Sequence, residues 1–212
     1  MEDIILVGFG GHAKSMLDSI ERSGLYNIVG FTDLEETEPY RGYKYLGSDN
    51  CLPFYFNKGV RNACICVGYM GMGRIRDTIY NMVKEIGFYL PVISDPAAII
   101  SRDVSIGEGT FIGKNVIINA DSKIGKMCII NSGSVVEHEN VIGDFTHLAV
   151  GSVLCGNVNV SDHSFIGANS TIIQGVTIGN NTQIGAGAVV VGNIPEDCVA
   201  VGVPARVVKH KQ

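Results

Sequence analysis

The feature that most constrains this 212-residue chain is a six-residue period that runs without interruption from Ile100 to Val190. Every sixth residue in this stretch is aliphatic, which gives sixteen such positions with no slip. An α-helix repeats every ~3.6 residues and a strand every ~2, so neither brings one residue in six inward. A short strand followed by a corner does. The stretch therefore predicts a repeated strand-and-corner unit.

Two further regularities accompany this period. A small or β-branched residue stands two positions before most of the aliphatic residues, for example Thr110, Ser122 and Ser152. We expect it to face inward as well, where a tight corner leaves little room. Glycine often follows the aliphatic residue, as at Gly107 and Gly143, where we expect the backbone to turn without a Cβ. The combined pattern is typical of a parallel β-helix built from hexapeptide repeats.

The first part of the chain, residues 1–93, has a different pattern and predicts a small α/β domain. Apolar runs and amphipathic stretches predict strands over residues 4–7, 28–31, 63–67 and 88–93, helices over residues 12–23 and 74–86, and a short element over residues 52–57. The second helix is expected to bury Ile75, Ile79, Met82, Val83 and Ile86. Asp95-Pro96 marks the change of period, so we expect domains over residues 1–93 and 94–212.

A glycine-rich turn lies between the first predicted strand and the first predicted helix. Its spacing, Gly8-x-Gly10-x-x-Ala13 with Asp33 after the second strand, satisfies a loose dinucleotide fingerprint. In that motif, backbone N–H groups at a helix N-terminus face phosphate and a carboxylate faces ribose. Residues 1–93 supply only one mononucleotide-binding half, so a diphosphate nucleotide with a single base fits better than NAD. The plainer alternative is that the glycines only permit the strand and helix to pack.

Composition and charge narrow the function classes. A net charge of −5 without an extended Lys/Arg cluster disfavours nucleic acid as a partner. No apolar run approaches the ~20 residues of a membrane helix, and no secretory leader is visible, so we expect no membrane association and a cytoplasmic location. The six cysteines form no CxxC pair and are expected to be reduced structural thiols.

Among the five histidines, His138 is the best candidate for catalysis, because it lies between Glu137 and Glu139 within the central repeats. An unperturbed histidine has a pKa of about 6.5, which suits a general base near neutral pH. No GxSxG motif is present, so direct attack in a ternary complex is expected rather than an acyl-enzyme. His138 and His147 are too few and too isolated for a four-ligand metal site, and no metal is predicted.

The chain resembles one branch of the hexapeptide acyltransferases. The resemblance rests on Gly-Phe-Gly-Gly-His-Ala, Gly-Phe-Thr-Asp, the closing Val-Gly-Val-Pro-Ala and, above all, the block from Asn131 to His147. The branch includes sialic-acid O-acetyltransferase-type proteins and N-acetyltransferases of UDP-4-amino-6-deoxy sugars, as in bacillosamine synthesis. The resemblance implies a left-handed β-helix, a Rossmann-like half domain that binds the UDP-sugar, acetyl-CoA as cosubstrate and a homotrimer with sites between subunits.

The same resemblance implies roles for individual residues. His138 is implied as general base and Glu139 as its carboxylate partner. The acetyl thioester or pantetheine arm is implied to lie near Asn131, His147 and Gly156. Expected sugar-nucleotide contacts are Gly10, Gly11, His12, Asp33 and Gly68. The chain departs from the family pattern at Asp33-Leu34 and over residues 68–73, the positions where the family is expected to contact uracil and the sugar.

Several readings stay open on sequence alone. The first is an acetyl-CoA-dependent N-acetyltransferase of a UDP-linked 4-amino-6-deoxy sugar, and the second is a sugar O-acetyltransferase of the sialic acid type. A non-catalytic sugar-nucleotide-binding scaffold and an NAD-dependent oxidoreductase represent other classes. A single histidine base serves an amine or a hydroxyl acceptor, so the sequence does not decide the acceptor, the sugar, the acyl chain or the pathway.

Overall fold

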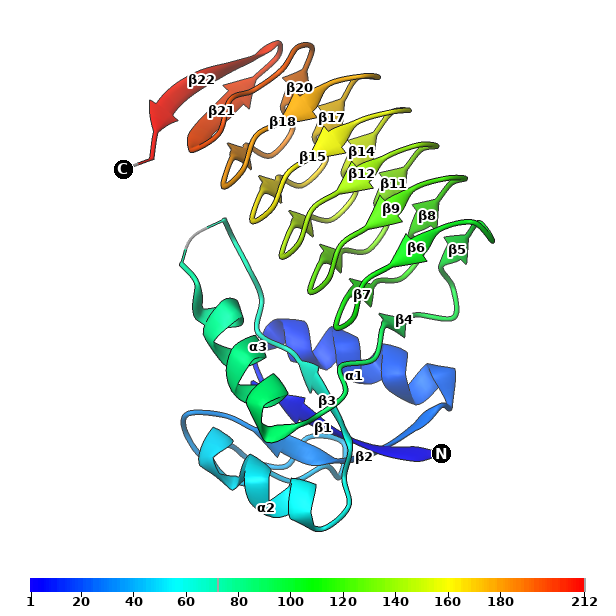
Figure 1. Cartoon of the computed structure of the whole chain (residues 1–212), viewed down its shortest axis with the longest axis vertical. Helices are drawn as coiled ribbons and strands as arrows, with labels where there is room; N and C mark the ends of the chain where they lie inside the picture. Colours follow the sequence, from blue (N-terminus) through cyan, green and yellow to red (C-terminus); the bar gives the residue numbers. More distant parts are fainter. Residues whose placement is uncertain (72, 212) are drawn as a thin grey trace. The chain divides into compact units, whose positions relative to one another are not determined.

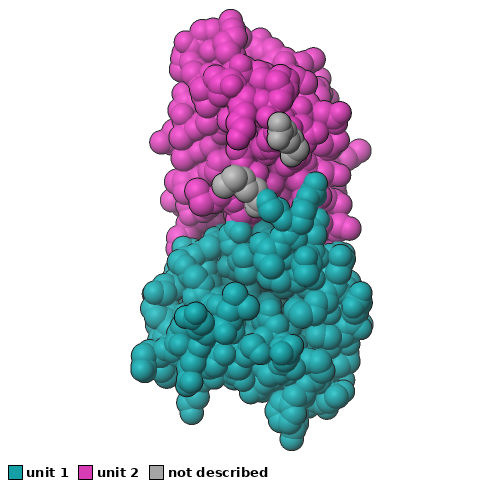
Figure 2. Space-filling model, turned by 90° about the vertical axis from the view of Figure 1, so that its left-hand side faces the viewer, with its two compact units in different colours: residues 1–68, 73–94 teal, residues 69–72, 95–212 magenta. Residues whose placement is uncertain are grey.

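The computed structural model describes residues 1–71 and 73–211; Met72 and Gln212 lie outside the described residues. The chain divides into two compact units (Figures 1 and 2). Unit 1 comprises residues 1–68 and 73–94, and unit 2 comprises residues 69–72 and 95–212. The short segment 69–72 therefore belongs to unit 2 although unit 1 flanks it on both sides in the sequence.

Unit 1 is a three-stranded parallel sheet with helices, as its sequence pattern predicts (Figure 1). The strand order is β2-β1-β3. Its elements are β1 (Glu2–Val7), α1 (Gly11–Ser23), β2 (Tyr26–Thr32), a 3₁₀ turn (Asp49–Cys51), α2 (Leu52–Asn57), β3 (Asn62–Ile65), α3 (Ile75–Ile86) and β4 (Ile93–Ser94). Apolar residues spaced three and four apart on α1 (Ala13, Met16, Leu17 and Ile20) are buried, and both α1 and α3 end at a glycine in the left-handed conformation.

The prediction of a strand over residues 88–93 is wrong. Tyr89 makes only an isolated bridge to Asn62, and the two-residue β4 follows later. Pro91 lies between them and has no N–H to donate to a ladder, which explains the break. The predicted apolar face of α3 is also partly wrong, because Ile75 is 56% exposed while the neighbouring Arg76 is buried.

Unit 2 is a parallel β-helix whose strands are mostly two residues long. Its first sheet contains β5 (Ile99–Ile100), β8 (Ile117–Ile118), β11 (Val135–Val136), β14 (Val153–Leu154), β17 (Thr171–Ile172) and β20 (Val189–Val190). Its second contains β6 (Ser105–Ile106), β9 (Lys123–Ile124), β12 (Val141–Ile142), β15 (Asn159–Val160) and β18 (Thr177–Ile178). A third sheet includes β7 (Phe111–Ile112), β10 (Ile129–Ile130), β13 (His147–Leu148), β16 (Phe165–Ile166), β19 (Gln183–Ile184), β21 (Cys198–Gly202) and β22 (Ala205–His210).

One turn of the β-helix takes eighteen residues, since each strand pairs in parallel with the strand three repeats later. Ile129 pairs with His147, and His147 pairs with Phe165. Figure 1 shows the coils stacked in sequence order, closed by the antiparallel pair β21 and β22. This is the parallel β-helix that the hexapeptide period predicts, and it agrees with the left-handed form that the family resemblance implies. Among the described residues no helix is long and apolar enough to cross a bilayer.

Both predicted inward positions are confirmed. From Ile112 to Val190 the aliphatic residues of the six-residue period are at most 4% exposed, and each buried aliphatic side chain contributes about 1.5–3 kcal/mol. The small residues two positions earlier are buried too. Most of their hydroxyls donate to a carbonyl fifteen residues later, for example from Thr110 to Gly125 and from Ser134 to Ala149, whereas that of Ser152 donates to the hydroxyl of Ser134. The polar groups inside the β-helix are thus satisfied between coils.

The corners correct the predicted role of glycine. From Ile106 to Ile184, the residue in the left-handed conformation is the third after each aliphatic residue, such as Gly133 or Glu139, and not the glycine that follows it directly. Glycines such as Gly107 are needed for another reason. A Cβ there would come within 2.5 Å of the backbone N of Lys126 in the next coil. Close stacking of coils, rather than an unusual φ, therefore selects glycine at that position.

Candidate active site

A pocket of about 510 Å³ lies at the C-terminal ends of the strands of unit 1. Gly8 follows β1, Asp33 follows β2 and Gly68 lies just beyond β3, and all three line the pocket. Ligands of parallel α/β sheets bind at this edge. The five residues expected to contact a sugar nucleotide all line this one pocket; they are Gly10, Gly11, His12, Asp33 and Gly68.

The glycines of the turn separate into two kinds. Gly8 has a φ of +86°, and a Cβ there would lie 2.7 Å from Cγ2 of Val67, so this glycine is required by the fold. At Gly10 and Gly11 a Cβ would meet nothing within 4 Å. Packing therefore explains Gly8 alone. The open space at the other two glycines, at the N-terminus of the thirteen-residue helix α1, suits a phosphate group.

Asp33 also holds the protein's own backbone in place. Its carboxylate accepts the backbone N–H of Phe9 at 2.7 Å and that of Leu34 at 2.7 Å, so both oxygens hold the pocket's own loops. The ring of Phe9 also stacks on Phe31 with 3.7 Å between centroids. Asp33 thus fixes the glycine-rich turn, an arrangement that the motif alone does not reveal.

The rest of the pocket wall is mainly apolar. Leu34 and Ile75 stand at the pocket with 89% and 56% of their surface exposed, and Val67 and Ile79 complete this apolar part. Cys66 also lines the pocket, but it is only 1% exposed and its burial raises the pKa of its thiol well above the usual value. A thiol that stays protonated is a poor nucleophile.

In unit 2, His138 and Glu139 form an ion-pair geometry at a corner of the β-helix. Nδ1 of His138 lies 3.0 Å from Oε2 of Glu139, and the two side chains are 59% and 62% exposed. A carboxylate oxygen only accepts, so Nδ1 is the donor in this contact, and Nε2 is the nitrogen left for a substrate. The other flanking carboxylate, Glu137, instead accepts the side-chain amide of Asn119. Only one of the two glutamates therefore orients the imidazole.

Gly156 lies directly against the imidazole of His138. A Cβ at Gly156 would come 2.6 Å from Cε1 and 2.7 Å from Nε2 of His138. The two residues are eighteen apart, which is one coil, so they occupy the same corner in successive turns. The family resemblance implies that Gly156 lies near the cosubstrate; the structure adds a direct role in making room for the imidazole. The eighteen-residue spacing was a signal that could have identified this contact.

Asn131 and His147 are joined to each other and to the segment that follows β3. Nδ2 of Asn131 lies 3.4 Å from Nε2 of His147, and Nδ1 of His147 bonds to the carbonyl oxygen of Tyr69. Since the carbonyl accepts, Nδ1 carries the proton and Nε2 accepts from the asparagine amide. Both ring nitrogens of His147 are thus engaged, and the side chain is 9% exposed. This geometry suits a positioning residue rather than an acid or base.

The two central histidines belong to different sheets of the β-helix. His138 follows β11 in the first sheet, whereas His147 opens β13 in the third. In the described part of the chain, no group of three or more His, Cys, Asp or Glu side chains is placed to hold a metal ion. A hexapeptide β-helix with an exposed imidazole paired with a carboxylate at one of its corners is typical of the acyltransferase class.

Comparison with known proteins supports this class. Residues 3–83 match the family model of the PglD N-terminal domain, and residues 103–138 and 157–192 match the bacterial transferase hexapeptide model. No protein of curated function matches the sequence in a direct search.

Solved structures match over nearly the whole chain. A histidine-to-alanine variant of GDP-perosamine N-acetyltransferase from Caulobacter crescentus, in complex with CoA and GDP-perosamine, is 34% identical, with a TM-score of 0.92 and coverage of 99% of this chain and 98% of that one. The acetyltransferase domain of PglB from Neisseria gonorrhoeae, in complex with acetyl coenzyme A, is 29% identical, with a TM-score of 0.90 and coverage of 98% and 99%. The chain belongs to the hexapeptide-repeat sugar N-acetyltransferase family and is an acyltransferase.

Proposed function

We propose that this protein transfers the acetyl group of acetyl-CoA to the amino group of a nucleotide-linked 4-amino-6-deoxy sugar, with His138 as general base. The observation that carries the proposal is the exposed imidazole of His138, oriented by Glu139 through a 3.0 Å contact. The relatives that bind CoA, acetyl-CoA or GDP-perosamine support the choice of donor and acceptor. The sugar nucleotide is proposed to occupy the unit 1 pocket.

The chemistry requires one base and no covalent intermediate on the protein. The amine attacks the thioester carbonyl, a C–N bond forms, the C–S bond breaks and CoA leaves as its thiolate, which then takes the amine's proton from His138 to become the thiol. Nε2 of His138 accepts the proton that the nitrogen loses, and Glu139 stabilises the imidazolium that results. The buried, protonated Cys66 does not compete as a nucleophile. Direct transfer between two bound substrates is therefore the proposed mechanism.

The nucleotide part of the substrate is proposed to be a diphosphate held by backbone N–H groups. Gly10 and Gly11 leave space at the N-terminus of α1, where the helix dipole favours an anion. We retain UDP as the proposed nucleotide, and the relative that binds GDP-perosamine makes GDP the alternative to test. An NAD-dependent oxidoreductase is disfavoured, because the unit 1 sheet has three strands and corresponds to one mononucleotide-binding half.

We also propose a homotrimer, because the residues that point out of the β-helix differ in polarity between its sheets. The first sheet presents Ile99, Ile117, Val135, Val153, Thr171 and Val189, whereas the second presents Ser105, Lys123, Val141, Asn159 and Thr177. An apolar outer face suits contact with another protein surface, and a polar one suits water. His138 follows Val135 of the apolar face, so packing of copies there would place His138 beside a neighbouring chain. Closed threefold symmetry gives every copy the same contact with its neighbours.

The variant Val153→Asp tests this arrangement by placing a charge on the apolar face. If this variant remains trimeric in sedimentation, the arrangement is wrong.

The function is tested with purified protein, acetyl-CoA and UDP- and GDP-linked 4-amino-6-deoxy sugars, measuring thiol release and the mass of the sugar product. A gain of one acetyl group on nitrogen is expected. Acetylation of a hydroxyl would favour the sialic acid type of reaction. Binding of both substrates without turnover would favour the scaffold. All six cysteines are free, which suits the proposed cytoplasmic location.

A further inference from the structure

Three consecutive backbone carbonyls after β3 each accept a hydrogen bond from a side chain of the β-helix. The carbonyl of Tyr69 accepts Nδ1 of His147, that of Met70 accepts Nε2 of Gln183 at 3.1 Å, and that of Gly71 accepts Nζ of Lys211 at 3.0 Å. We call residues 69–71 the anchored segment. Backbone groups in a connecting segment are ordinarily left to water, so three directed side-chain donors indicate a specific attachment.

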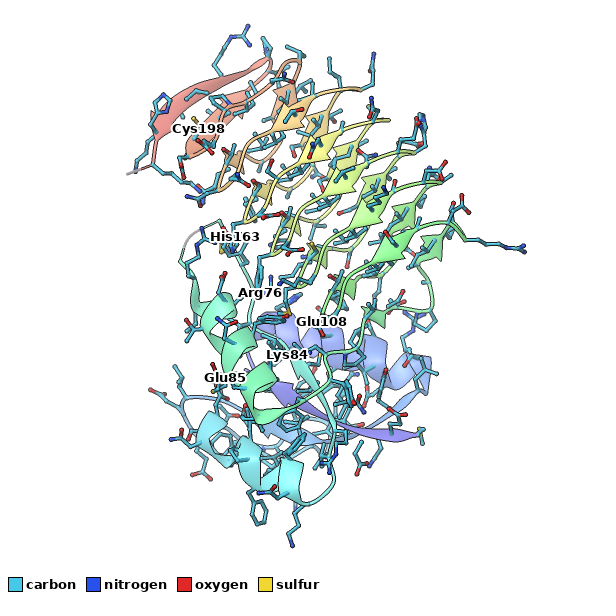
Figure 3. All side chains as sticks on the ribbon, in the orientation of Figure 1. Arg76, Lys84, Glu85, Glu108, His163 and Cys198 are labelled. Carbon is cyan, nitrogen blue, oxygen red and sulfur yellow. The ribbon has the colours of Figure 1, made fainter. Side chains whose placement is uncertain are left out.

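The side chain of Tyr69 adds a fourth attachment. Its hydroxyl donates to the carbonyl of His163 at 2.6 Å, and the residue is 6% exposed. Figure 3 labels His163 at the corner of the β-helix. The ring of His163 in turn stacks on Phe145, with 5.1 Å between centroids. The anchored segment is therefore held by both its backbone and its aromatic side chain.

Two sequence details fit this attachment. Gly71 has a φ of +78°, and a Cβ there would overlap the amide group of Gln183. Lys211 also bonds to the backbone and side-chain oxygens of Asn181, which holds its ammonium group in place. A glycine without a Cβ and a buttressed lysine are both needed for the donors to reach the carbonyls.

The anchored segment joins two walls of the unit 1 pocket through the chain itself. Gly68 lines the pocket and is bonded directly to Tyr69, while Ile75 and Ile79 of α3 line the pocket just after the segment. Fixing a few residues of backbone lowers the entropy that a ligand must otherwise remove on binding. Anchoring residues 69–71 therefore preorganises the wall formed by Gly68 and the start of α3.

We propose that Gln183 and Lys211 are positioning residues for the sugar nucleotide: by holding residues 69–71 they raise the affinity of the pocket for the nucleotide without touching it. The inference rests on the proposed function, because it requires the unit 1 pocket to bind a nucleotide diphosphate.

The test compares the full-length wild type with the double variant Gln183→Ala/Lys211→Ala, using calorimetric titration with UDP, GDP and acetyl-CoA as separate probes. Losing this anchorage should raise the Kd of the preferred nucleotide about fivefold to twentyfold, since ordering of the segment then opposes binding. The Kd for acetyl-CoA should change by less than about twofold, because the donors act on the nucleotide wall. The melting temperature is recorded for each protein.

Matched controls separate anchoring from a general loss of polar groups. The double variant Thr177→Ala/Lys209→Ala removes an outward polar side chain from another sheet and a lysine two residues before Lys211, and it should bind as the wild type does. The single variant Lys211→Arg keeps native Gln183 and a cationic donor. It should therefore keep most of the wild-type affinity for the preferred nucleotide.

Unchanged nucleotide affinity in the Gln183→Ala/Lys211→Ala variant would overturn the inference while leaving the proposed function in place. An equal loss of nucleotide and acetyl-CoA affinity would overturn it too, because the anchorage would then be a general structural feature. If neither UDP nor GDP binds the wild type, the proposed function fails and the inference fails with it.

Discussion

The glycine-rich turn of unit 1 and the His138 corner of unit 2 differ in which part of the chain supplies their polar groups. At the turn, functional groups come from the backbone, and Gly10 and Gly11 matter for the space they leave. At the corner, they come from side chains, and Gly156 matters because the imidazole of His138 fills the space it leaves. In the first region glycine leaves room for the proposed ligand; in the second it leaves room for the proposed general base of the protein itself.

The difference teaches that similar substitutions should have different kinetic effects. A bulky side chain in the turn competes with the bound substrate and should raise KM. A substitution at the corner displaces or removes a group that acts in the transition state and should lower kcat. Four substitutions test this division, taken from the largest expected effect to the smallest.

Replacing His138 by alanine should lower kcat by ~10²–10⁴, because the general base is lost while binding contacts remain. Thiol release with saturating acetyl-CoA and sugar nucleotide measures this effect. If His138→Ala keeps more than about a tenth of wild-type kcat, the base assignment is wrong.

Gly156→Ala should lower kcat by about 10², because the added methyl pushes the imidazole of His138 out of position and a displacement of ~1 Å has this effect. The variant Gly192→Ala adds the same methyl where nothing lies within 4 Å and should behave as the wild type. Steady-state kinetics of the two variants at matched protein concentration decide the point. Equal activity of both would mean that the His138–Gly156 contact does not position the base.

Gly10→Leu should raise KM for the sugar nucleotide by about tenfold to a hundredfold, since each lost hydrogen bond to a charged group is worth about 1.5–3 kcal/mol. KM for acetyl-CoA should not change. Gly8→Ala is the contrasting variant, because Gly8 has a left-handed φ and no room for a Cβ; it should lower the melting temperature. Damage to both KM values in Gly10→Leu would point to misfolding instead.

Glu139→Gln should have the smallest effect, a loss in kcat of no more than about tenfold, because an orienting hydrogen bond contributes about 0.5–1.5 kcal/mol. The amide keeps an acceptor oxygen for Nδ1 of His138. The pH profile of kcat/KM measures the change in the imidazole without its carboxylate partner. A loss as large as that of His138→Ala would show that the carboxylate has a more direct role than orientation.

The sequence predicted much of the fold because the signals are local and repeated. The six-residue period from Ile100 onward predicted the strand-and-corner unit, its two inward positions and the parallel β-helix. The strand–turn–helix pattern around Gly8 and Gly10 determined the start of unit 1. The sequence predictions were wrong in two kinds of place. At Pro91 a single residue interrupts the strand predicted over residues 88–93. At Gly107 the contact that requires glycine is with the backbone of Lys126, which lies one coil away.

For the candidate site, the sequence by itself determined which residues had suitable chemistry and which short stretches held them. It identified His138 with its flanking glutamates and the glycines of the turn. Only the tertiary structure decided that Glu139 rather than Glu137 contacts the imidazole, and that Asp33 holds its own turn. The tertiary structure also brought Tyr69, Met70 and Gly71 to donors as far as 140 residues away in the chain. Such contacts depend on how coils and loops meet in space, and a period or a motif records only what is near in sequence.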